Sequence, residues 1–134
     1  MYPTMQSPAN AYSRVGLESN VAASNPHLLI VMLFDGAILN VNSAAVSIAH
    51  NDVAGKGQAI SKAIEIINSG LKASLDMNAG GELAQRLAAL YDYMVSRLLY
   101  ANLHSSEPAL KEVAGLLLEI KGAWEAIRDQ ANAA

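Results

Sequence analysis

The sequence predicts an all-α protein: an antiparallel up-down four-helix bundle with an irregular N-terminal segment. The 134 residues are rich in Ala and Leu, which are both strong helix formers. Apolar residues recur at steps of three and four along four stretches, which is typical of helices with one buried face. No stretch shows the alternation of apolar and polar residues that predicts a strand. Short connections between the four stretches make neighbouring helices run antiparallel.

Residues 1–24 form the irregular segment, because Pro, Gly and polar residues leave no helical period there. Two interpretations stay open: a disordered tail, or a segment that docks on the bundle through Tyr12, Val15 and Leu17. The segment lacks the positively charged and apolar regions of a secretory signal. We therefore expect a cytoplasmic protein, with the bundle over residues 25–130.

The first helix begins at Pro26, with Ser24 or Asn25 as its cap, because Pro is favoured at the first helical position. It ends near residues 50–52. Asp35 is its only charged residue, so this helix is too apolar for an ordinary surface position. Its core stripe is Ile30, Phe34, Ala37, Val41, Ala45 and Ile48. A second apolar stripe beside it is Leu29, Leu33 and Gly36.

The apolar run over residues 28–39 is too short to cross a membrane. As a helix it spans about 18 Å, against about 30 Å of hydrocarbon, and the polar Asn40 and Asn42 follow. We therefore expect a helix buried on more than one side and no stable membrane insertion.

Three further helices follow. The second covers about 55–75, and the third covers about 82–102 after a loop. The fourth runs from a cap at Ser105 or Ser106 to about 128. The core stripe of the second helix is Ile60, Ile64, Ile67 and Leu71, and that of the third is Leu83, Leu87, Leu90, Met94 and Leu98. The core stripe of the fourth helix is Leu110, Val113, Leu117, Ile120, Trp124 and Ile127. Beside these stripes lie Ala63 and Ile66 on the second helix and Tyr93 on the third.

The ionisable residues predict no catalytic, metal or cofactor site, so we expect no enzyme. The three His lie at helix ends or in loops, and none is spaced three or four residues from another His. We expect His27 in an exposed first turn and Glu112 in a solvated stripe. The absence of Cys excludes disulfides and a cysteine nucleophile.

Two carboxylates, Asp35 and Asp92, are exceptions because they lie among apolar or aromatic residues. A buried carboxylate must be paired or hydrogen-bonded. We expect each to pair with Arg86, Arg97 or a Tyr hydroxyl, and a ligand-binding role is the alternative.

The overall composition indicates binding to another protein. The chain is 52% hydrophobic and only 16% charged, against about 25% charged residues in average proteins. Exposed apolar helix surface marks interaction sites, although Ala richness or burial in a homodimer would also account for it. The net charge of −3 argues against nucleic acid as a partner, since that binding depends on basic patches.

Two segments carry a resemblance to a known family. Residues 23–38, which include the run Met-Leu-Phe-Asp-Gly-Ala, resemble the first-helix signature of the flagellar secretion chaperone FliS family. Residues 80–94, which include Leu-Tyr-Asp-Tyr-Met, resemble its third helix, and Trp124 matches a Trp of its last helix. The similarity covers about residues 11–126. Phe34 stands where the family usually has Tyr, and Asn25 is inserted before the Pro.

The resemblance implies a cytoplasmic chaperone without catalysis or cofactor. Such a chaperone binds the disordered C-terminal segment of flagellin, prevents its premature polymerisation and delivers it to the flagellar type III export apparatus. It also implies that the N-terminal segment, through Tyr12, covers part of the binding groove in the free chaperone. A homodimeric scaffold and a small enzyme are the alternatives, and a weak homodimer of the free chaperone stays open. The residues expected at the groove or its cap are Tyr12, Leu29, Leu33, Ala63, Ile66 and Tyr93.

Overall fold

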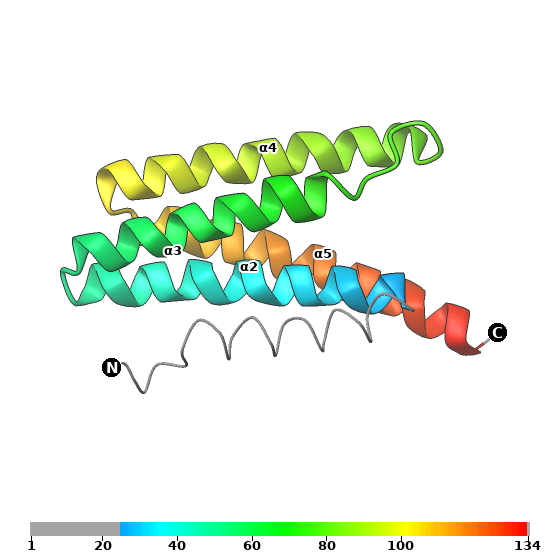
Figure 1. Ribbon diagram of the computed structural model, residues 1–134, viewed down its shortest axis with the longest axis horizontal. Coiled ribbons are helices and arrows are strands. Elements are labelled where there is room, and N and C mark those ends of the chain that lie inside the picture. Colours follow the sequence, from blue (N-terminus) through cyan, green and yellow to red (C-terminus); the bar gives the residue numbers. More distant parts are fainter. Residues whose placement is uncertain (1–24, 134) are drawn as a thin grey trace.

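The computed structural model describes residues 25–133, and it confirms the predicted all-α four-helix bundle. Helix α2 spans Pro26–Ala49 and α3 spans Val53–Glu65. A π-helix, η1, continues α3 over Ile66–Lys72, and α4 (Gly81–His104) and α5 (Glu107–Ala133) complete the bundle. Successive helices run antiparallel (Figure 1). The irregular segment 1–24 and the residues expected to dock from it lie outside the described residues.

Side-chain caps fix three of the helix starts. Asn25 accepts a hydrogen bond from the backbone N–H of Leu28 at 3.2 Å, as an N-cap residue does. Asp52 caps α3, so that helix begins two residues before the expected start. Ser106, rather than Ser105, caps α5 by accepting from the N–H of Ala109 at 3.2 Å. Ser105 instead takes the left-handed conformation, φ 49°, that ends α4.

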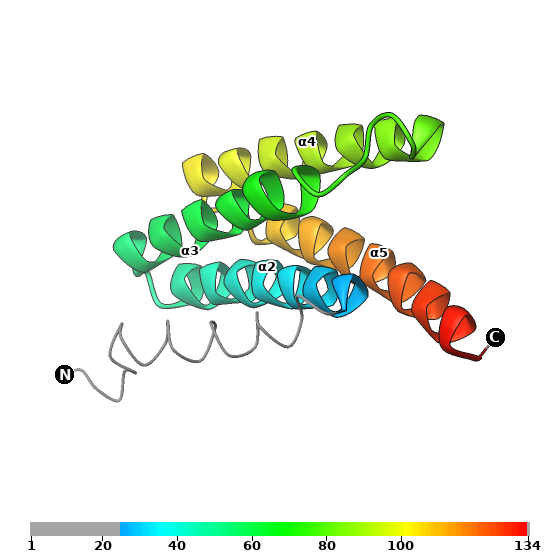
Figure 2. The same cartoon turned by 45° about the vertical axis from the view of Figure 1, so that its right-hand side comes forward.

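The four helices surround one core. Helix α2 packs against α3 and α5, while α4 packs against η1, α3 and α5, so α2 and α4 lie at opposite corners. From the turn at Ser105, α4 and α5 diverge, which leaves the bundle closed at that end and open at the other (Figures 1 and 2). The largest fully buried side chains are Phe34, Val41, Ile60, Ile67, Leu71, Met94, Leu98, Leu110, Val113 and Leu117.

One buried cation lies at the closed end. Lys56 is the buried charged residue of the described part of the chain, and its Nζ donates to Ser105 Oγ at 2.9 Å. This hydrogen bond ties the first turns of α3 to the α4–α5 turn. The closed end is therefore held by a polar contact as well as by the core.

Gly70 lets η1 pack closely against Leu33 of α2. A Cβ at Gly70 would lie 2.9 Å from Leu33 Cδ2, closer than real Cβ atoms come to their neighbours. The sequence predicted a single regular helix over 55–75, and the wider turn of η1 was not expected. The close approach places Leu33 and Ile66, both half-buried, between α2 and η1.

Helix α2 is long and apolar enough, by length and composition, to cross a membrane. Core helices of bundles also meet that criterion. Here α2 contributes five buried residues to the core: Val31, Phe34, Ala37, Val41 and Ala44. Part of its apolar surface is therefore buried within the bundle.

Candidate partner-binding site

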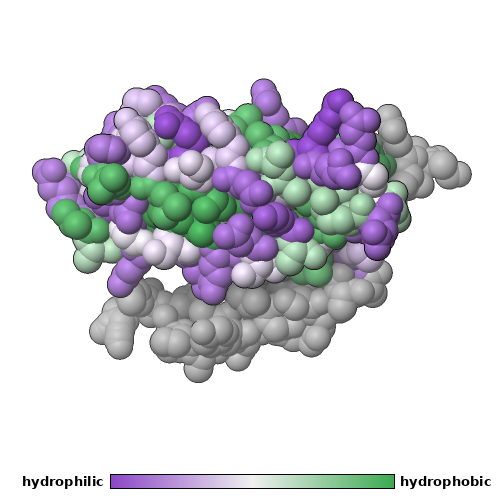
Figure 3. All heavy atoms as spheres, turned by 90° about the horizontal axis from the view of Figure 1, so that it is seen from above, coloured by the Kyte–Doolittle hydropathy of each residue, from purple (hydrophilic) through white to green (hydrophobic). Residues whose placement is uncertain are grey.

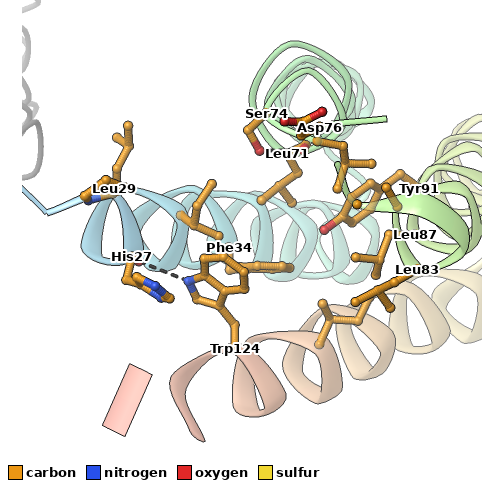
Figure 4. A pocket seen from close by; sticks show the side chains of 16 residues that line it. His27, Leu29, Phe34, Leu71, Ser74, Asp76, Leu83, Leu87, Tyr91 and Trp124 are labelled. Atoms are coloured by element: carbon orange, nitrogen blue, oxygen red, sulfur yellow. Dashed lines mark hydrogen bonds between the residues drawn. The ribbon is translucent and has the colours of Figure 1, made fainter. Parts of the chain in front are cut away.

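An apolar pocket of about 450 Å³ lies at the open end of the bundle, where α4 and α5 diverge. Its size falls within the range of about 300–1,000 Å³ typical of ligand sites. Side chains from the start of α2, the end of η1, the first half of α4 and the end of α5 line it (Figure 4). The large apolar ones are Leu29, Ile30, Phe34, Leu71, Leu75, Leu83, Leu87, Tyr91, Ile120 and Trp124.

The loop before α4 forms one rim of the pocket. The Asp76 carboxylate accepts hydrogen bonds from the N–H groups of Asn78 and Ala79, at 3.1 and 2.9 Å. The N–H of Gly80 donates to the Asp76 carbonyl, and a Cβ at Gly80 would lie only 2.6 Å from that oxygen. A glycine at this position therefore permits the tight turn that starts α4 beside the pocket.

Trp124 closes the pocket against the first turn of α2. Its indole N–H donates to the His27 carbonyl at 3.2 Å, and the two rings stack with centroids 4.6 Å apart (Figure 4). The expectation that His27 lies in an exposed turn was wrong, because the Trp124 ring covers it. Its Nδ1 is buried and has no hydrogen-bond partner among the described residues.

Helix α4 exposes apolar side chains toward both of its ends. Leu83 lies at the pocket, and Leu99 and Leu103 lie near the closed end. The face seen from the α4 side shows green apolar patches separated by purple polar side chains (Figure 3). Of these three side chains, Leu83 lines the apolar pocket, while Leu99 and Leu103 lie toward the other end of α4.

A polar cluster holds α4 on α5 beyond the pocket. Tyr93 donates its hydroxyl hydrogen to Glu112, and Arg97 Nε donates to the same carboxylate at 2.7 Å. The Arg97 guanidinium also lies over the Tyr100 ring, 4.7 Å from its centroid. Glu112 is partly exposed, as a residue of a solvated stripe would be, but the sequence did not predict that α4 brings two donors to its carboxylate.

These contacts predict an acid-dependent contribution of Glu112 to stability. The hydrogen bonds from Tyr93 and Arg97 lower the pKa of Glu112 below its ordinary value of 4.5. A lowered folded-state pKa stabilises the fold above the unfolded pKa, and the effect disappears as the pH falls through the folded pKa. We expect Glu112→Gln to lower the Tm at pH 7 and to have a steadily smaller effect below pH about 4.5. Thermal unfolding from pH 7 to 2.5 measures this, and a pH-independent difference in Tm would contradict it.

The two exceptional carboxylates are paired, but with partners that the sequence did not predict. Asp92 accepts from Lys72 Nζ at 2.7 Å, and both side chains are exposed. Asp35 pairs with Lys121 Nζ, also at 2.7 Å. The predicted partners, Arg86, Arg97 or a Tyr hydroxyl, were wrong for both.

Because the Asp92 pair is exposed, we expect Asp92→Ala to lower the free energy of unfolding by less than about 1 kcal/mol. Urea denaturation measures this, with Lys72→Met as the matched removal of its partner. A loss of 3 kcal/mol or more, of the size found for buried pairs, would show that the carboxylate is buried.

The structure gathers few of the predicted groove residues in one place. Leu29 lies at the pocket, while Leu33 and Ile66 lie between α2 and η1. Ala63 is fully buried in the core, so its side chain does not reach a partner. Tyr93 is exposed and bound to Glu112, and Tyr12 lies outside the described residues.

The residues that line the pocket were not predicted as a site from the sequence. Phe34, Leu83, Leu87 and Trp124 were expected in core stripes, and no position was predicted for Tyr91. The one Trp of the chain, with its polar ring nitrogen, was the available signal, because a Trp often lies where an apolar surface meets a polar group. In residues 25–133 no group of three or more His, Cys, Asp or Glu could hold a metal ion.

A four-helix bundle with an apolar pocket is typical of small helical proteins that bind an apolar segment of another protein. The family model described as flagellar protein FliS matches residues 8–131. The chain therefore belongs to the FliS family, as the resemblance predicted.

Individual relatives support this family assignment. The flagellar secretion chaperone FliS of Salmonella typhimurium is 50% identical over 122 residues, which cover 91% of this chain and 90% of the relative. FliS of Escherichia coli is 44% identical over 86% of this chain and 85% of the relative. FliSB of Pseudomonas aeruginosa is 41% identical over 87% of this chain and 91% of the relative. The family assignment makes this protein a flagellar export chaperone.

Proposed function

We propose that this chaperone binds the disordered C-terminal segment of flagellin in the cytoplasm. By covering that segment it prevents premature polymerisation, and it delivers flagellin to the flagellar type III secretion apparatus. The function requires binding and release, and it requires no catalysis and no cofactor. The observation that carries the proposal is the apolar pocket at the open end of the bundle, in a chain of the FliS family.

The pocket suits an amphipathic helical segment. Such a segment binds through apolar side chains at steps of three and four, and these anchors enter an apolar groove. Leu83 extends the apolar surface outward from the pocket along α4, and Leu29 does so along α2. A disordered segment loses conformational entropy when it folds on binding, so a large apolar surface must compensate for that loss.

The remaining groove assignments are part of the same proposal. Leu33 and Ile66 would extend the surface along the line between α2 and η1, since both are half-buried there. Tyr93 would lie at its edge beside α5. Tyr12, with its segment, would cap the surface in the free chaperone. The segment joins the bundle at Asn25, next to Pro26 and His27 at the pocket.

Calorimetry with flagellin from the same organism tests the function. We expect a one-to-one complex with full-length flagellin and a large negative heat-capacity change, since apolar surface is buried. Removal of about the last 40 residues should abolish binding, a length consistent with coupled folding that buries about 1,000–3,000 Å². Equal binding of full-length and truncated flagellin would refute the proposal, and binding of the chaperone only to itself would indicate a homodimeric scaffold.

A further inference from the structure

Tyr91 carries a hydroxyl group at a position where a purely apolar side chain could fill the core. Tyr91 is only 3% exposed, and its ring packs with the core. Its hydroxyl makes no hydrogen bond with the described residues. Figure 4 shows the hydroxyl pointing into the pocket that Tyr91 helps to line. Buried Tyr hydroxyls usually have a partner, so this one is available to a ligand.

The walls around this hydroxyl are almost entirely apolar, with Ser74 and Asp76 on the η1 side. A hydroxyl without a partner among the described residues, in an otherwise apolar cavity, indicates that the ligand carries a polar group as well as apolar ones.

The charges around the pocket define that polar group. Burial raises the pKa of Tyr91 to about 12, so the hydroxyl keeps its proton at neutral pH and acts as a donor. Among the described residues no Lys or Arg lines the pocket, and Asp76 is the one carboxylate there. An anionic ligand would therefore lose its hydration without gaining a cation. The acceptor that fits is a neutral carbonyl oxygen.

We propose that the pocket is a subsite for an amide carbonyl on an apolar stem, and that the Tyr91 hydroxyl donates a hydrogen bond to its oxygen. The flagellin segment presents this group, so the inference rests on the proposed function. The apolar walls bind the stem, and the hydroxyl selects segments with an amide at that position. Tyr91 is thus a specificity-determining residue as well as a core residue.

The first test compares two substitutions that each remove a single hydroxyl. Tyr91→Phe keeps the ring in the core, and Tyr100→Phe is the matched control on the exposed face of the same helix. We expect Tyr91→Phe to bind the flagellin C-terminal segment about fivefold more weakly by calorimetry, as expected for one lost hydrogen bond. Tyr100→Phe should bind like wild type, and both variants should keep the wild-type Tm or exceed it.

The outcomes separate the two proposals. If the wild-type protein binds flagellin and Tyr91→Phe binds it equally well, the subsite is refuted while the proposed function stands. If the wild-type protein does not bind flagellin, the proposed function fails, and a second probe then decides the subsite.

That probe is isovaleramide, a small molecule with a branched stem and a neutral amide. Trp124 is the one Trp of the chain and lines the pocket, so its fluorescence reports occupancy. We expect the Trp124 fluorescence of the wild-type protein to change with isovaleramide concentration until it saturates. In Tyr91→Phe the midpoint concentration should be about fivefold higher. The isovalerate anion should cause no saturable change in fluorescence. No saturable change with the amide, or equal midpoints in the two proteins, would overturn the proposal.

Discussion

Leu83→Asp is expected to weaken flagellin binding at least about 100-fold while leaving the bundle folded. Leu83 is 65% exposed and lies at the pocket, so the substitution removes little from the core. In the complex, however, the new carboxylate would be buried against apolar side chains without a cation, and that is strongly unfavourable. A 100-fold loss corresponds to about 2.7 kcal/mol, the size of a central interface residue.

Leu103→Asp is the matched control for this prediction. Leu103 is 79% exposed on the same helix but lies at the closed end, away from the pocket. Calorimetry with the flagellin C-terminal segment should show near wild-type affinity for this variant, and circular dichroism should show both variants folded. Similar losses in both variants would mean that α4 binds along its whole length, and no loss in Leu83→Asp would exclude the pocket.

Phe34→Ala is expected to lower the free energy of unfolding by about 3–5 kcal/mol. Phe34 is 1% exposed, and it is part of both the core and the pocket wall. Removal of its ring takes apolar contacts from the core and leaves a cavity that the diverging helices cannot easily fill. Urea denaturation at a fixed pH and temperature measures the change.

Leu39→Ala serves as the control on the same helix. Leu39 is 66% exposed, so its substitution should change the free energy of unfolding by less than about 0.5 kcal/mol. If Phe34→Ala cost less than about 1 kcal/mol, the ring would not be a core element, and the open end would be more adaptable than the structure indicates.

The four helices could be predicted from the sequence because each of them carries its own stripe of apolar residues. The stripe of α5, for example, places Leu110, Val113 and Leu117 inward, and all three are buried. The π-helix was not predictable in the same way. A wider turn leaves apolar residues inward on both sides, and Gly70 shows its close packing against the Leu33 side chain only in the folded structure.

The site was harder to predict than the fold, because helical stripes do not say where helices separate. Leu83 and Leu98 belong to one stripe, yet Leu98 is buried and Leu83 is exposed at the pocket. Asp92 shows a related limit. Neighbours in sequence point to different faces of a helix, so Tyr91 is buried while Asp92 beside it is exposed and pairs across to η1.

The hydrogen bond between Lys56 and Ser105 gives the two ends of the molecule different local stability. At the closed end, a residue of α3 is tied to the α4–α5 turn, and the polar cluster around Glu112 follows farther along α4. Toward the open end, the first turns of α4 begin at Gly80 without a side-chain cap. Local opening of a helix requires the least free energy where such ties are missing. The first turn of α4 is therefore expected to open more readily than the closed end, while Asp92 farther along the helix stays paired with Lys72 of η1.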